Sequence, residues 1–300
     1  MEIAISGGTG FIGKALTLYL ASNGHTVYIL TRQLRENHSP STIQYIKWDA
    51  ADSKFPLPSI DVVINLAGES INNGRWTKKQ KEKIINSRLQ TTKGLIKQLQ
   101  TLPQSPHTFI NASAIGYYGT SETEIFTEDC PKSGNDFLAT TVKLWEEEAS
   151  KAAALGIRTV YTRFGVVLGK DGGALPKMLL PYQLFIGGTI GSGDQLLSWV
   201  HLEDVVRMID FAIHTKEVNG ALNITAPHPV TMEEFGRTIA KVMHRPHWLP
   251  VPAFALKILL GEMSTLILQG QNVLPQKAIQ HGYTHSYDTL EHALQNIVSH

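Results

Sequence analysis

The sequence predicts an α/β protein of the Rossmann type, in which a doubly wound parallel sheet is followed by a smaller, mostly helical C-terminal lobe. Three observations support this fold class. Strand-like and helix-like segments alternate through the first half, glycines follow the first strand at the spacing G-x-G-x-x-G, and turns rich in Gly and Pro follow Gly165. Such alternation implies right-handed crossovers and a parallel sheet covered on both faces.

The elements can be followed in order along the chain. Residues 3–5 form an apolar run, and apolar residues recur at helical spacing over 11–21. Asn23-Gly24 ends that helix, and the β-branched run 26–30 predicts the second strand. The same patterns predict further strands at 43–46, 62–66, 108–111 and 159–162, and helices over 78–99 and 137–155.

The change in sequence composition after Gly165, where turns rich in Gly and Pro begin, suggests two coupled structural units. A length of 300 residues is long for one compact domain. We expect residues 1–164 to form a nucleotide-binding domain, to which residues 199–226 return. Residues 165–198 and 227–300 are expected to form the lobe on the substrate side.

Composition narrows the class of protein. Hydrophobic residues make up 42% and charged residues 18% of the chain, which is typical of a globular protein and excludes a disordered, collagen-like or coiled-coil chain. Lys and Arg number 27 against 26 Asp and Glu, so charge gives no case for binding nucleic acid or a membrane surface. We therefore expect a small-molecule substrate as the partner, and the oligomeric state stays open, with a homodimer one alternative.

The expected compartment is the cytoplasm. The single cysteine, Cys130, cannot form an internal disulfide, which favours a reducing compartment. The first residues carry an acid at Glu2 and glycines that break the apolar run, unlike a signal peptide. No stretch approaches the roughly 18 apolar residues that a membrane span needs.

A glycine-rich turn after the first strand predicts a dinucleotide site. Gly8, Gly10 and Gly13 fit G-x-G-x-x-G between a strand and a helix. Such glycines permit the tight turn, let a pyrophosphate approach the backbone, and let the helix pack against its strand. The amides at the helix start, those of Phe11 and Ile12, would then face the phosphates.

The end of the second strand favours NADP(H) over NAD. This strand ends in Leu30-Thr31-Arg32, where the fingerprint expects an acid for a ribose 2′-hydroxyl. A guanidinium suits a 2′-phosphate, which an Asp would repel. We therefore place Thr31 and Arg32 at the cofactor; the alternative is that Arg32 is an ordinary solvated surface residue.

Several segments resemble motifs of the extended short-chain dehydrogenases/reductases, the group that contains sugar-nucleotide epimerases. They are Gly7-x-x-Gly10-x-x-Gly13, Asn65-Leu66-Ala67-Gly68, and residues 110–119, 163–169 and 199–205. The resemblance implies that Leu66, Ala67 and Gly68 close over the cofactor. It also implies that residues 110–119 carry the catalytic Ser, here Ser113.

A narrower resemblance covers essentially the whole chain. A branch called epimerase family proteins carries N-L-A-G-E, here ending in Glu69, and S-R-x-x-T-T, here Ser87 to Thr92. Its C-terminal domain of unknown function has a V-L-P-x-[RK] segment, here 273–277. The resemblance implies bound NADP(H), with Arg88 a further cofactor contact, but it implies no particular substrate. Glu69 also lies just beyond a strand end, where ligands bind in open α/β folds.

The chain departs from the superfamily at the catalytic pair. Those enzymes use Tyr-x-x-x-Lys on a helix, where the Lys lowers the pKa of the Tyr acid. Here Phe137 stands at the Tyr position and Thr141 at the Lys position, and Lys143 is rotated to another face. Ser113 remains, and Tyr117 or Tyr118 is the candidate substitute acid; either tyrosine can equally be a packing residue.

Two further patterns are explained better by ordinary structural roles than by a functional site. His201 and Asp204 could line the cleft, but the first turn of a helix with Glu203 and Asp204 near its dipole explains them better. The twelve histidines form no Cys/His cluster, so no metal site is predicted.

Two function hypotheses follow. The first is an NADP(H)-dependent oxidoreductase or epimerase that acts on a small polar, sugar-linked type of substrate through an atypical active site. The alternative is a catalytically weak NADP(H)-binding protein that reports redox state to a partner. The intact phosphate-binding turn favours either of these over a scaffold protein.

Overall fold

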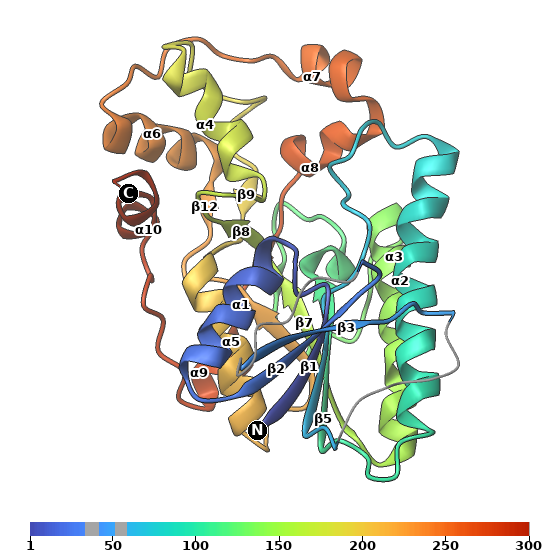
Figure 1. Cartoon of the computed structure of the whole chain (residues 1–300). Helices are drawn as coiled ribbons and strands as arrows, with labels where there is room; N and C mark the ends of the chain where they lie inside the picture. The colour runs from blue at the N-terminus through green and yellow to red at the C-terminus, as the bar shows by residue number, and fades with distance from the viewer. Residues whose placement is uncertain (34–41, 52–58, 300) are drawn as a thin grey trace.

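A computed structural model describes residues 1–33, 42–51 and 59–299, and its centre is a seven-stranded sheet (Figure 1). The strand order is β11-β7-β5-β4-β1-β2-β3, and every neighbouring pair is parallel. The order reverses at β1, between β4 and β2, which is the switch point where open α/β sheets bind ligands. The strands are β1 (Glu2–Ser6), β2 (Thr26–Thr31), β3 (Ile43–Lys47), β4 (Val62–Asn65), β5 (Thr108–Ala114), β7 (Arg158–Phe164) and β11 (Gly220–Ile224).

Helices cover both faces of this sheet. Helices α1 (Phe11–Ser22) and α5 (Leu202–His214) pack together on one face, and α2 (Lys78–Leu99) and α3 (Phe137–Ala149) pack on the other. Because side chains alternate along each strand, the sheet contributes residues to the apolar cores on both of its faces. Ile3 and Ile5 join the core under α1 and α5, whereas Ala4 between them joins the core under α2 and α3. The predicted fold class is confirmed.

The C-terminal lobe has its own apolar core. Two small sheets lead into it, β8 (Val166–Leu168) beside β10 (Trp199–His201) and β9 (Leu196–Leu197) beside β12 (Val230–Thr231). Buried side chains from α4, α6 and α10, among them Leu175, Phe235 and Leu294, pack together there. The remaining elements are α4 (Leu175–Gln183), α6 (Met232–Met243), α7 (Ala253–Leu260), α8 (Thr265–Leu268), β13 (Asn272–Val273) beside β6 (Ile125–Phe126), α9 (Gln276–Gln280) and α10 (Leu290–Val298).

His201 and Asp204 organise the start of α5. Nδ1 of His201 accepts the amide of Glu203 (3.2 Å), so the imidazole caps the helix. Asp204 is completely buried and accepts hydrogen bonds from the Tyr283 hydroxyl (2.8 Å) and from the amides of Ser286 (2.8 Å) and Tyr287 (2.9 Å). The carboxylate thereby ties the C-terminal segment to the sheet domain, and the helix-start interpretation of this pair is the right one.

One element differs from the expected pattern. The helix expected over residues 137–155 ends at Ala149 and continues as a 3-10 helix over Ser150–Leu155. Strand β11 pairs with β7 after α5 and completes the sheet, and the expected division into two units stays a prediction. In the described ranges no helix has both the length and the apolar character to cross a membrane.

Candidate functional site

The turn between β1 and α1 requires glycine at two positions for steric reasons. Gly7 has φ +75°, and a Cβ there would lie 2.7 Å from the carbonyl carbon of Leu66. A Cβ on Gly13 would lie 2.1 Å from the carbonyl oxygen of Gly7, closer than real Cβ contacts allow. Gly7 therefore makes the turn possible, and Gly13 allows α1 to begin directly against β1.

Gly10 differs from Gly7 and Gly13, because neither its backbone conformation nor a close backbone contact requires a glycine there. It is the N-cap residue of α1, with φ −77°, a backbone conformation that any residue can adopt. A Cβ there would meet only the carbonyl oxygen of Gly7 at 3.3 Å, which leaves the outer side of the turn open. No side chain caps α1 and no acid lies in its first turn, so the amides of Phe11 and Ile12 present their dipoles to an anion.

Thr31 and Arg32 lie at the carboxyl end of β2, beside β1 at the switch point. The Thr31 hydroxyl hydrogen-bonds the backbone of Gln33. Arg32 is exposed and makes no ion pair within residues 1–33, 42–51 and 59–299. Among these residues, therefore, no carboxylate competes with an anionic group for its guanidinium.

The loop after β4 lies across the other side of the glycine turn. The amide of Leu66 donates to the carbonyl of Ser6 (2.9 Å), and Gly68 lies against the side chain of Arg88. Ion pairing with Lys83 (3.0 Å) and a hydrogen bond from Asn73 (3.2 Å) lower the pKa of Glu69. Glu69 is therefore held as a carboxylate by its own loop and by α2, which does not suit a proton donor.

Arg88 is a largely buried cation whose hydrogen-bond partners are neutral. Its Nη1 donates to the carbonyls of Glu69 (2.9 Å) and Ile84 (3.0 Å), and its guanidinium lies 5.0 Å from the centroid of the Trp145 ring. Burial lowers the pKa of Arg88 to about 10, and the nearby charge of Glu69 offsets this only in part. A buried guanidinium without a hydrogen-bonded carboxylate is a fitting partner for a phosphate.

A buried polar network joins the carboxyl ends of the central strands. Ser6 donates to Asn65 (2.6 Å), and the Asn65 amide donates to Asn111 (2.7 Å) and to Thr92 (2.9 Å). Trp145 also donates to Thr92 (2.9 Å). Because the side chains come from five different elements, this network fixes β1, β4, β5, α2 and α3 relative to one another.

Ser113, at the end of β5, is hydrogen-bonded to a residue that sequence reasoning missed. Its hydroxyl donates to Oε1 of Glu146 on α3 (2.5 Å). Arg163 on β7 donates to both carboxylate oxygens of Glu146, each at 2.8 Å. Burial opposes the charge of Arg163, but the hydrogen bonds and charge of Glu146 raise its pKa, so the guanidinium stays protonated. Ser113, Glu146 and Arg163 form a buried serine–carboxylate–guanidinium triad.

The two tyrosines after β5 differ in environment. Tyr118 is buried, stacks on Phe126 and donates its hydroxyl to Asn223 (2.8 Å). Burial raises the pKa of Tyr118 to about 12, so this residue is a packing residue and a poor acid. Tyr117 is half-buried with the guanidinium of Arg163 3.6 Å from its ring centroid, and its hydroxyl has no hydrogen-bond partner in the described part of the chain.

The positions of the usual Tyr and Lys carry no proton relay. The Phe137 ring packs edge-on against Trp76 at 5.2 Å, with the ammonium of Lys81 4.9 Å from its centroid. Thr141 is buried and donates its hydroxyl to the carbonyl of Phe137 (2.7 Å). Lys143 is exposed, as its place on the helix predicts. These residues cannot replace the tyrosine–lysine pair, because Phe137 has no exchangeable proton and Thr141 carries no charge.

Contacts from the C-terminal lobe close one side of this edge. Arg75, in the loop after β4, donates to the carbonyls of Ile258 and Leu259 (2.8 Å) at the end of α7. Lys81 near the start of α2 pairs with Glu262 at 2.5 Å, in the 3-10 helix (Gly261–Ser264) after α7. Figure 1 shows α7 and α8 above the carboxyl ends of the strands. The contacts join the end of α7 to the loop after β4, and the following 3-10 helix to α2.

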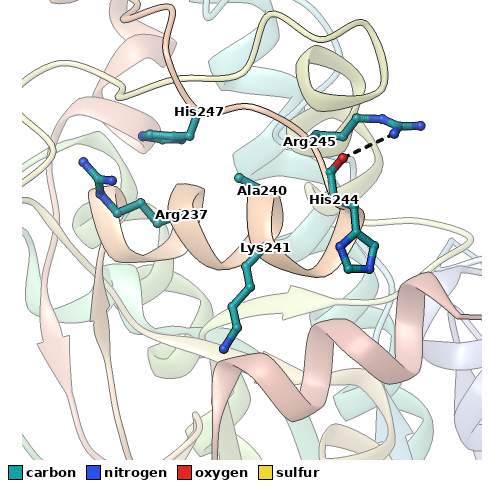
Figure 2. A pocket seen from close by; sticks show the side chains of 6 residues that line it. All are labelled: Arg237, Ala240, Lys241, His244, Arg245 and His247. Atoms are coloured by element: carbon teal, nitrogen blue, oxygen red, sulfur yellow. Dashed lines mark hydrogen bonds between the residues drawn. The ribbon is translucent and has the colours of Figure 1, made fainter.

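A separate basic hollow of about 510 Å³ lies on α6, away from the predicted site residues. It is lined by Arg237, Ala240, Lys241, His244, Arg245 and His247. Figure 2 shows that the cationic side chains diverge from α6 instead of converging on one point. Arg237 pairs with Glu233 (2.6 Å) and Lys241 with Glu291 (2.7 Å). We therefore assign the functional site to the sheet edge and not to this hollow.

Comparison with known proteins identifies the family. The model of the NAD dependent epimerase/dehydratase family matches residues 3–225, and that of a domain of unknown function, DUF1731, matches residues 251–297. The chain is 51% identical over 301 residues to the epimerase family protein YfhF of Bacillus subtilis (strain 168), with 100% of this chain and 98% of that protein covered. It is 42% identical over 294 residues to the epimerase family protein SSP1921 of Staphylococcus saprophyticus, with 98% of each covered.

Solved structures that resemble this chain include members of the same family. The crystal structure of human epimerase family protein SDR39U1 (isoform 2) with NADPH has 36% sequence identity and a TM-score of 0.89, with 100% of this chain and 99% of that chain covered. UDP-glucose 4-epimerase of Thermotoga maritima with UDP-glucose is 17% identical at a TM-score of 0.80, with 100% of this chain and 98% of that chain covered; it shares the fold. The chain belongs to the NAD dependent epimerase/dehydratase family, the extended short-chain dehydrogenases/reductases, and ends in a DUF1731 domain.

Proposed function

We propose that this protein is an NADP(H)-dependent oxidoreductase or epimerase whose substrate is a small polar molecule with a reacting hydroxyl or carbonyl, of the nucleotide-sugar type. The observation that carries the proposal is the Ser113–Glu146 hydrogen bond (2.5 Å) at the carboxyl ends of the strands. A buried serine bonded to a buried carboxylate beside a dinucleotide turn is suited to receive a proton. The binding of NADPH by the 36% identical human relative supports the cofactor part of the proposal.

The residues at the sheet edge fit NADP(H). The turn from Gly7 to Gly13 leaves space outside Gly10 for a pyrophosphate, and the uncapped start of α1 favours its charge. Arg32, which has no ion-pair partner among the described residues, would hold a 2′-phosphate. Arg88, whose hydrogen-bond partners there are carbonyls, would contact the cofactor from the other side. When bound, the nicotinamide supplies hydride transfer.

The triad can then handle the accompanying proton. In the oxidative direction a substrate hydroxyl would donate to Oγ of Ser113, which already donates to Oε1 of Glu146. The proton of the substrate moves to Ser113 as the serine proton moves to Glu146, and the return transfer serves reduction. Arg163 holds both oxygens of Glu146 and keeps the carboxylate oriented toward Ser113.

Tyr117 is the second group available to the substrate. Its hydroxyl has no partner among the described residues, in contrast to that of Tyr118. We assign Tyr117 to binding or protonating a substrate oxygen, and we withdraw Tyr118 from the catalytic candidates because Asn223 and the surrounding core engage it.

The alternative function, an NADP(H)-binding sensor with weak turnover, rests on a different observation. Phe137 and Thr141 replace the acid and the lysine, and both side chains are engaged in packing or in a local hydrogen bond. Loss of a positioned acid typically lowers the rate about 10²- to 10⁴-fold. A sensor would keep NADPH affinity without needing the Ser113–Glu146 pair.

The two functions are separated by one experiment. The purified protein is analysed for co-purified nucleotide and then screened with carbonyl compounds and nucleotide sugars, with NADPH consumption or formation followed by absorbance. Turnover that falls at least tenfold in Ser113→Ala, with unchanged NADPH affinity, supports the enzyme. Firm NADPH binding without turnover on any of these compounds supports the sensor, and turnover that Ser113→Ala leaves intact overturns the relay.

A further inference from the structure

Two histidines and an aspartate from distant parts of the sequence meet at the edge of the sheet opposite the cofactor site. His25 lies in the turn directly before β2, and Asp210 and His214 lie in the last two turns of α5. One ligand atom from each residue lies within 4.8 Å of the other two. Asp210 and His214 are four residues apart on a helix, so their side chains lie one above the other.

The hydrogen bonds around the cluster leave ligand atoms available. Oδ1 of Asp210 is buried and accepts no hydrogen bond in the described ranges, but it lies 3.3 Å from Nδ1 of His214, and Oδ2 accepts from the Tyr19 hydroxyl (3.4 Å). Nδ1 of His214 contacts the carbonyl of Asp210 (3.0 Å), and Nδ1 of His25 contacts the amino group of Met1 (3.3 Å). Metal-ligating imidazoles are commonly oriented by such a contact through the other ring nitrogen.

A buried carboxylate oxygen that accepts no hydrogen bond is costly unless a nearby cation or metal ion satisfies it. The ligand atoms around a tetrahedral Zn²⁺ are about 3.3 Å apart, given metal–ligand distances of about 2.0–2.1 Å. Closing the cluster from 4.8 Å therefore requires side-chain movements of about 1.5 Å at most. His214 can supply this movement because 54% of its side chain is exposed.

We infer that His25, Asp210 and His214 form a binding site for a divalent transition-metal ion of the Zn²⁺ type. Two imidazole nitrogens and one carboxylate oxygen favour Zn²⁺, Ni²⁺ or Co²⁺ over Mg²⁺ and Ca²⁺, which prefer all-oxygen sites. The ion would join the connection between α1 and β2 to the end of α5. It would therefore act as a structural cross-link, remote from the nucleotide turn.

The test is a metal titration of the full chain after removal of metal with a chelator. It is done at about pH 8.5, because metal binding requires unprotonated imidazole nitrogens. Co²⁺ reports the coordination geometry through its visible absorption bands, and competition by Zn²⁺ gives the Zn²⁺ affinity. Zn²⁺ at a hundredfold excess over its dissociation constant should raise the melting temperature by about 5 °C.

Variants decide whether the ion binds at this cluster. His25→Ala and His214→Ala should each weaken Zn²⁺ binding at least tenfold, while their NADPH affinity shows that the fold is intact. His281→Ala, at an exposed position after α9, is the control and should bind Zn²⁺ like the unsubstituted protein. The absence of a Co²⁺ band and of a thermal shift at millimolar Zn²⁺, or equal Zn²⁺ affinity in His214→Ala and the unsubstituted protein, overturns the proposal.

Discussion

Oγ of Ser113 lies 2.5 Å from Oε1 of Glu146, and this hydrogen bond joins the end of a central strand to a carboxylate buried on α3. Nε and Nη2 of Arg163 donate to the two oxygens of the same carboxylate, so the serine hydroxyl is oriented by a rigid partner. In the enzyme that we propose, this arrangement takes over proton handling that Phe137 and Thr141 cannot perform.

The first prediction concerns Glu146→Gln. The amide can still accept from Ser113 but cannot take up a proton, so we expect kcat to fall about 10²- to 10⁴-fold while NADPH affinity stays unchanged. Steady-state kinetics and a fluorescence titration measure the two quantities. Glu147→Gln, at the exposed neighbouring position, should behave like the unsubstituted protein.

Arg163 complicates that variant, because breaking a buried ion pair costs about 3–5 kcal/mol. Ser113→Ala therefore accompanies it, since this change leaves the pair of Glu146 and Arg163 in place. Activity that survives in both variants would show that another group, with Tyr117 first, moves the proton.

The second prediction separates two glycines of the turn. Gly10→Val should keep the fold and lose NADPH binding, because φ is −77° and the added atoms point into the space for the pyrophosphate. Gly13→Ala should distort the turn itself, since its Cβ would lie 2.1 Å from the carbonyl oxygen of Gly7. Circular dichroism, melting temperature and NADPH titration are compared for both. Undiminished NADPH affinity in Gly10→Val would place the nucleotide elsewhere.

The third prediction concerns pH and the cap of α5. Burial lowers the pKa of His201 below its ordinary value near 6.5, so the neutral ring is the form that stabilises the fold. This contribution is complete above about pH 6.5 and is lost as the pH falls toward the lowered pKa. His201→Asn keeps a capping side chain that does not titrate. The free energy of unfolding should therefore fall less steeply between pH 7 and pH 5 in His201→Asn than in the unsubstituted protein.

Denaturant titrations at several pH values give these slopes. His281→Asn, at an exposed position after α9, is the control and should keep the original slope. Identical slopes for His201→Asn and the unsubstituted protein would show that His201 does not couple stability to pH.

Local patterns were enough to predict the sheet and the nucleotide turn. A strand, the glycines at 7, 10 and 13, and the following helix are neighbours in the sequence, so their spacing carries the structure. The role of each glycine was less accessible, because it depends on which backbone atoms approach: Gly7 has the positive φ, and Gly10 does not.

Contacts between distant elements were beyond sequence reasoning. Glu146 meets Ser113 only because α3 packs beside β5, and no spacing within the chain indicates that pairing. Tyr117 and Tyr118 are adjacent and identical in type, yet burial and Asn223 engage only the second. In the same way His25 meets Asp210 and His214 through the packing of α1 against α5.

The account depends most on the cofactor, and the affinities for NADPH and NADH test it most directly. Arg32 is exposed at the end of β2 without an ion-pair partner in the described ranges, so a 2′-phosphate can gain about 1.5–3 kcal/mol from it. We predict that NADPH binds about ten- to a hundredfold more tightly than NADH, and that Arg32→Asp reverses this order. Equal dissociation constants of the unsubstituted protein for NADPH and NADH would contradict the account.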